Sequence, residues 1–101
     1  PLNDAQKDEF GKMADEVITF ISRCMLEIKR NDYTAFDQLV EKAVSISNAL
    51  TQLKKNELKR IQGQSGSTKV SMVYLNMIQE TQNVVSFTSN LIKVSRKFQM
   101  E

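Results

Sequence analysis

Residues that break helices are almost absent from the interior of this sequence. Its one proline is the first residue, and its three glycines stand at positions 11, 63 and 66. Proline and glycine most readily end a helix, so the stretches between them can run for many turns. Two polar segments, KRND (29–32) and QGQSGST (62–68), interrupt the chain. The sequence therefore predicts three long helices, at about 3–30, 33–62 and 69–98.

Apolar side chains in the first two segments recur three or four residues apart, which places them on one stripe of each helix and predicts that both stripes face a core. We expect the first helix to start at Asn3 or Asp4 and the second at Asp32 or Thr34, all residue types that cap helices well. The first stripe is Phe10, Met13, Val17, Phe20, Ile21, Cys24 and Ile28. The second is Phe36, Leu39, Val40, Ala43, Ile46, Ser47, Leu50, Leu53, Leu58 and Ile61.

The third segment carries two apolar lines that together cover about half of a helix circumference. The first line alternates steps of four and three, as in the a and d positions of a heptad repeat, and Glu80 is its one break. We expect this line to be the centre of the buried face and the second to flank it. The first line, which we call the heptad line, is Val73, Met77, Glu80, Val84, Phe87, Leu91, Val94 and Phe98. The second is Tyr74, Ile78, Val85 and Ile92.

The short connections predict antiparallel neighbours, so the fold class is all-α, an up-down-up three-helix bundle in a single domain over residues 1–101. Each helix would be about 40 Å long, which is long for a bundle of three. Leu26 and Leu75 also point away from the main stripes. Both features predict that further surface is covered, and we expect self-association through helix faces.

Several function classes are disfavoured by composition. The net charge is only +2 and the two signs are interspersed, so no basic block predicts binding of nucleic acid. Histidine is absent, which removes the commonest general base, and we expect a binding protein rather than an enzyme. The single cysteine, Cys24, cannot form an internal disulfide and is expected to be a small buried residue in a reducing compartment.

Membrane insertion of this stretch is not predicted, because no apolar run approaches the roughly 20 residues that span a bilayer. The chain opens on PLNDAQ without methionine. We expect it to be a fragment of a longer protein.

Glu80 falls about 20° from the centre of the heptad line, and an isolated buried carboxylate is costly. Three interpretations stay open: a buried carboxylate with hydrogen-bond or ion-pair partners, a wet rim position at a helix end or open groove, and a metal ligand. The candidate partners are Asn83, Lys54 and Glu16. Lys54 also admits a simpler interpretation, in which its stem covers apolar surface and its ammonium reaches water.

Two stretches resemble PhoU-like domains. MADEVITFISRCMLEIKRNDYTAFDQLVEKAVSI (13–46) is similar to the opening helices of that family, and VYLNMIQETQNVVSFTSNLIKVSRKF (73–98) to its third helix. The family pairs a Glu and an Asp four residues apart to bind metal clusters. Here Asn76 stands in the place of the Glu and Glu80 in that of the Asp, so the resemblance implies a weakened metal pair at Asn76 and Glu80, and no other cofactor.

A lone unit of this kind resembles the cytoplasmic C-terminal domain of bacterial sodium/phosphate cotransporter family proteins. The resemblance implies a regulatory domain at the cytoplasmic face of the inner membrane. Such a domain would act by helix–helix contact with its own transmembrane transporter region, in phosphate transport or its regulation. The alternative is a free-standing helical adaptor or oligomerisation module with no link to transport.

Overall fold

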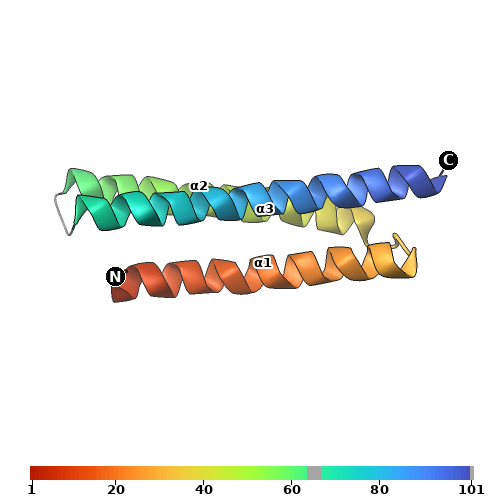
Figure 1. Ribbon diagram of the computed structural model, residues 1–101, viewed down its shortest axis with the longest axis horizontal. Helices are drawn as coiled ribbons and strands as arrows, with labels where there is room; N and C mark the ends of the chain where they lie inside the picture. Colours follow the sequence, from red (N-terminus) through yellow and green to blue (C-terminus); the bar gives the residue numbers. More distant parts are fainter. Residues whose placement is uncertain (64–66, 101) are drawn as a thin grey trace.

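Three long helices make up the computed structural model, which describes residues 1–63 and 67–100 (Figure 1). They are α1 (Asp4–Arg30), α2 (Phe36–Gln62) and α3 (Thr68–Met100). Consecutive helices run in opposite directions, and each helix contacts the other two. The molecule is a rod of 54 × 19 × 17 Å. The predicted all-α three-helix bundle is therefore confirmed; the centre of the predicted second loop, residues 64–66, lies outside the described residues.

The start of α1 follows directly from its sequence. The Asn3 side chain accepts a hydrogen bond from the Gln6 backbone N–H at 2.8 Å, and the Gln6 side chain accepts one from the Asn3 N–H at 2.9 Å. This reciprocal pair is a capping box, which satisfies two N–H groups that a helix start leaves without partners. The prediction of Asn3 or Asp4 as the start of the first helix is confirmed.

The turn after α1 is tighter than predicted. Asn31 takes the left-handed conformation, with φ 55° and ψ 40°, and the Asp32 N–H closes the helix by donating to the Glu27 carbonyl at 3.0 Å. The Asp32 carboxylate then accepts a hydrogen bond from the Thr34 N–H at 3.1 Å. Because Asp32 and Thr34 stabilise this turn, α2 begins only at Phe36, and the prediction of a start at Asp32 or Thr34 is wrong.

The apolar stripes of α1 and α2 face the core almost as predicted. The buried members are Met13, Val17, Phe20 and Cys24 of α1 and Leu39, Ala43, Ile46, Leu50 and Leu53 of α2. Leu58 is the exception, since it is 49% exposed while its neighbour Glu57 is completely buried. The stripe of α2 therefore ends in a carboxylate rather than a leucine.

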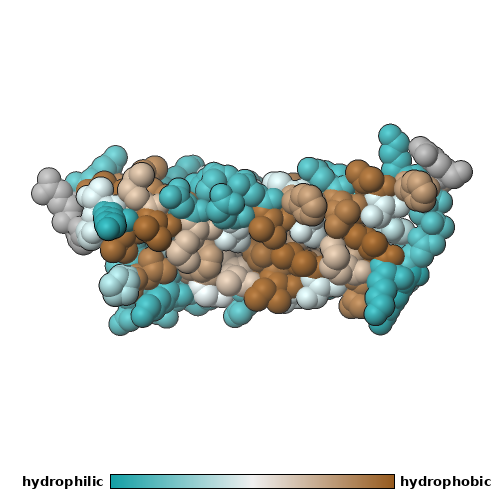
Figure 2. Space-filling model, viewed as in Figure 1, coloured by the Kyte–Doolittle hydropathy of each residue, from teal (hydrophilic) through white to brown (hydrophobic). Residues whose placement is uncertain are grey.

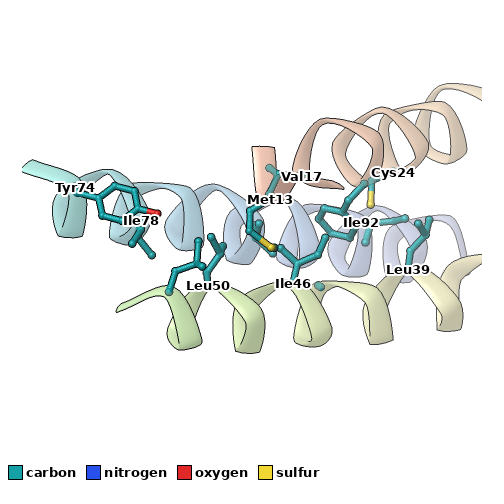
Figure 3. Packing of buried hydrophobic residues seen from close by; sticks show 13 residues of the cluster. Met13, Val17, Cys24, Leu39, Ile46, Leu50, Tyr74, Ile78 and Ile92 are labelled. Atoms are coloured by element: carbon teal, nitrogen blue, oxygen red, sulfur yellow. The ribbon is translucent and has the colours of Figure 1, made fainter. Parts of the chain in front are cut away.

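The face that α3 turns to the core differs from the prediction. Its buried apolar residues are Tyr74, Ile78, Val85 and Ile92, the line expected to flank the core (Figure 3). On the heptad line, Val73, Val84, Phe87, Val94 and Phe98 are exposed, and Met77 and Leu91 are only partly buried. The expectation that the heptad line is the centre of the core is wrong.

Polar contacts explain this orientation of α3. The Gln82 side-chain amide, in line with Ile78 and Val85, donates to the Ser47 carbonyl and to the Thr51 hydroxyl of α2, both at 2.9 Å. The Tyr74 hydroxyl donates to a Glu9 carboxylate oxygen on α1 at 2.8 Å. Both lines of α3 offer apolar side chains, but only the inner one also satisfies these buried polar groups.

We predict that alanine substitutions on the two faces of α3 lower stability by unequal amounts. Ile78→Ala should lower the free energy of unfolding by about 3 kcal/mol, because it leaves a cavity at a fully buried site. Phe87→Ala should lower it by less than about 1 kcal/mol, because Phe87 is 69% exposed. Urea unfolding of dilute protein, followed by circular dichroism, measures both. A larger loss for Phe87→Ala would mean that the heptad line is the core after all.

Candidate interaction surface

One side of the bundle, formed by α1 and α3, leaves apolar side chains uncovered. We call it the α1/α3 face. Its grooved part is lined by Phe10, Ala14 and Ile18 of α1 and Val73, Met77, Glu80 and Val84 of α3. We include the rest of the same line of α3, which continues through Phe87, Leu91, Val94 and Phe98. Two adjoining shallow grooves run between the helices, with Phe10 of α1 and Glu80 and Thr81 of α3 lining both. Figure 2 shows hydrophobic side chains gathered in a band along the molecule, bordered by hydrophilic ones.

Helix geometry explains why this face exists. The apolar arc of α3 is wider than its contact with α1 and α2, so one edge is buried and the other stays outside. On α1, Phe10 lies at the border of the core, where its ring meets that of Tyr74 edge to face with centroids 6.1 Å apart. Ile18, two turns further along, is 63% exposed.

Glu80 lies on this face and is exposed. It occupies the stripe position that the sequence predicts, but the stripe itself faces outward. The interpretation as a buried carboxylate is therefore wrong, and the open-groove interpretation describes what is observed. The carboxylate stays in water at the rim of both grooves, so it needs no buried partner.

The predicted partners of Glu80 have other neighbours. Lys54 is partly buried, and its ammonium donates to the Gln79 side-chain carbonyl on α3. Asn83 is exposed and accepts a hydrogen bond from the Gln79 amide at 3.0 Å. Glu16 forms an exposed ion pair with Lys42 of α2 at 2.9 Å. These three residues therefore do not assemble around Glu80.

Asn76 and Glu80, the implied metal pair, are both exposed and border one groove of the α1/α3 face. Within residues 1–63 and 67–100, no group of three or more His, Cys, Asp or Glu side chains is arranged to hold a metal ion. A hard cation prefers six or more oxygen ligands, so two ligands on an open surface do not make a complete site. The metal assignment stays a prediction of the resemblance.

A buried polar cluster joins all three helices near the N-terminus of α1. Arg60 of α2 donates to both carboxylate oxygens of Glu9, at 2.8 and 3.1 Å, and to Glu57 at 2.6 Å. The other Glu57 oxygen accepts from the Gln6 amide at 3.0 Å. The Tyr74 hydroxyl of α3 also joins the cluster, donating to Glu9 at 2.8 Å. A bidentate guanidinium contact of this kind fixes orientation as well as charge.

The cluster shifts the acid–base properties of its members. Burial alone would raise the pKa of Glu57, but hydrogen bonds from Ser71, Arg60 and Gln6 outweigh it, so the pKa falls below its ordinary value. Burial also raises the pKa of the Tyr74 hydroxyl, and its hydrogen bond to Glu9 raises it further. Glu57 is therefore ionised and Tyr74 neutral at pH 7. Because Arg60 lies between the two carboxylates, the cluster links the three helices and does not leave an acid and a base free to exchange protons.

Sequence reasoning missed this cluster. Arg60 lies outside the apolar stripe predicted for the second helix, and Glu9 lies 51 residues away from it. One signal was available: Glu57 and Arg60 are three apart, the spacing of an ion pair on one helix face. Their partner on α1 could not be read from the spacing, because it depends on how the helices align.

Cys24 fits its predicted role as a small buried residue, since it is fully buried in the core. Burial, with the nearby Glu27 charge, raises the pKa of its thiol to about 11. A thiol is a poor nucleophile when it stays protonated at neutral pH.

Among the described helices, none combines the length and apolar character needed to cross a membrane.

Comparisons of this chain with protein-family models, curated proteins and solved structures gave no match. The similarity to PhoU-like domains thus rests on the quoted stretches, and its functional implications stay predictions.

We predict that protonation of Glu57 lowers the free energy of unfolding at acidic pH. The lowered folded pKa means that the unfolded chain binds a proton at Glu57 more readily, so the stabilisation is full above the ordinary pKa of 4.5 and is lost as the pH falls through the folded pKa. Glu57→Gln should therefore flatten the decline in unfolding free energy between about pH 5 and about pH 3.

The matched control is Glu16→Gln, which neutralises an exposed glutamate and should keep the wild-type pH dependence. Urea unfolding at a series of pH values measures all three proteins. An equally steep decline in Glu57→Gln and wild type would show that Glu57 does not couple folding to pH.

Proposed function

We propose that this chain is a helical interaction module that binds another helix through the α1/α3 face. The observation that carries the proposal is the exposure of the heptad line of α3 beside Ile18 of α1. A contiguous apolar surface of this kind is typical of a protein–protein contact site. Binding would require no catalytic group, and the carboxylates of the partly buried Glu9 and the buried Glu57 are already engaged by Arg60.

The shape of the face supports a helix as the partner. Its exposed residues on α3 repeat at the spacing of a coiled-coil seam, so each can pack between side chains of a second helix. The grooves beside them, between Phe10 and Met77 and between Ile18 and Val84, follow the long axis and widen this surface toward α1. A helix laid in such a groove would complete a four-helix arrangement.

A more specific proposal comes from the PhoU-like resemblance. In it the chain is the cytoplasmic regulatory domain of a sodium-dependent phosphate transporter, and the α1/α3 face contacts other helices of the parent protein. Support consists of the quoted sequence similarity and of a surface suited to helix–helix contact. An adaptor or oligomerisation module would use the same face. The assignment to a transporter is therefore supported by the resemblance alone.

A binding experiment tests the interaction function. A labelled amphipathic peptide with leucine at the a and d positions of four heptads is titrated with the protein, and fluorescence anisotropy reports binding. Phe87→Asp should weaken binding at least about tenfold, because a carboxylate would be buried at the centre of the contact.

Leu26→Asp is the matched control, since Leu26 is 43% exposed and lines a groove with residues of α1, of α2 and of the turn between them. It should bind the peptide as wild type does. The proposal fails if wild type does not bind the peptide, or if Phe87→Asp binds it equally well.

A further inference from the structure

We infer that the partner of the α1/α3 face is a second copy of this chain, with the two α3 helices antiparallel. This inference rests on the proposed interaction function and names the partner for it. Three features of the face support it: its area, the pattern of its edge, and the positions of its charged residues.

The apolar area is close to what a dimer needs. Phe87 and Phe98 are 69% and 79% exposed and together present roughly 300 Å². With Ile18 and the exposed valines, the face presents on the order of 700 Å² of apolar surface, whereas a standard interface buries about 800 Å² per partner. Few stable monomers leave a patch of this size uncovered.

The edge of the face favours a helix over a membrane surface. Asn76, Asn83 and Asn90 follow one another at seven-residue spacing along one side of the heptad line, and all three are exposed. Helices that bind lipid surfaces carry lysine and arginine on this border, while uncharged amides pack against a second copy without repulsion. Glu80 within the line also disfavours contact with acyl chains.

The charges select the relative direction of the two copies. Glu80 is the one acidic residue within α3, and Lys97, at the opposite end, is on the same edge as the three asparagines. In a parallel pair with the helices in register, Glu80 would face its own copy, and like charges repel. In an antiparallel pair, Glu80 of one copy lies level with Lys97 of the other if the two-fold axis crosses α3 between Thr88 and Ser89. That axis also brings Phe87 against Leu91 of the partner copy, at the centre of the contact.

Sedimentation of the purified chain over a range of micromolar concentrations is the first test. We expect a monomer–dimer equilibrium that Phe87→Asp weakens at least about thirtyfold, as the loss of a central aromatic anchor does. Leu26→Asp, in the groove between α1 and α2, should leave the equilibrium unchanged. A monomer at every concentration, or a dimer that Phe87→Asp does not affect, would overturn the inference.

Charge reversal tests the ion pair. Glu80→Lys and Lys97→Glu should each weaken the dimer, and the double variant should restore most of the lost affinity because the pair is re-formed with opposite signs. Failure of the double variant to recover would exclude the proposed register. These residues are exposed, so circular dichroism should show unchanged helicity in all three proteins.

Cysteine cross-linking tests the direction. In the antiparallel pair the two copies of residue 90 are offset by only about 4–5 Å along the axis, whereas those of residue 76 are about 37 Å apart. Asn90→Cys should therefore form a disulfide dimer on mild oxidation and Asn76→Cys should not; Cys24 is buried and should stay reduced in both. Efficient cross-linking of both variants would indicate a parallel pair and would overturn the inference.

The two proposals fail in different ways. The chain could be monomeric and still bind the amphipathic peptide, with Phe87→Asp abolishing peptide binding. That result would support the interaction function and would exclude only the second copy as the partner.

Discussion

The contact of Arg60 with two carboxylates, Glu9 from α1 and Glu57 from its own helix, is the constraint on which this bundle depends. A buried carboxylate such as Glu57 is costly unless its hydrogen bonds are satisfied, and its donors come from different helices: Arg60 from α2 and Gln6 from α1. Hydrophobic burial would tolerate small shifts of one helix along another. The cluster does not tolerate them, because a shift of even one turn, about 5.4 Å, would separate the guanidinium from Glu9. It therefore fixes the alignment of α1 and α2 at one end of the rod.

The rotation of α3 follows from the same cluster. Tyr74 reaches Glu9 only when its side of α3 faces inward, and Gln82, two turns later, then meets the Ser47 carbonyl and the Thr51 hydroxyl of α2. Had the heptad line faced inward, these polar groups would have been displaced and Glu80 would have entered the core. Burying Phe87 and Phe98 would gain apolar area, but leaving a buried carboxylate without partners costs more. The more apolar line of α3 is outside because the inner one has its polar groups paired.

This explains how far the sequence could predict the structure. The scarcity of proline and glycine predicted three helices with nearly the observed bounds, and single apolar stripes predicted the core faces of α1 and α2. On α3 either of two apolar lines could face the core, and the sequence pattern distinguishes them only by their apolar content. The deciding contacts join residues 31 to 65 positions apart, which no local pattern contains. The misplacement of Glu80 has the same origin, since its angle on the helix was right and the direction of the stripe was not.

Glu80 has a different physical meaning on an exposed apolar face than in a core. In the separate molecule its carboxylate stays hydrated, so it has little effect on folding. Once a partner helix covers the stripe, that hydration is lost, and the cost falls only if a cation lies within reach. Apolar packing alone is nearly indifferent to whether the partner runs parallel or antiparallel. One carboxylate within the stripe makes the direction matter. Arrangements that place it against apolar side chains or against another acid are destabilised. A residue that weakens association in general can thus restrict it to one geometry.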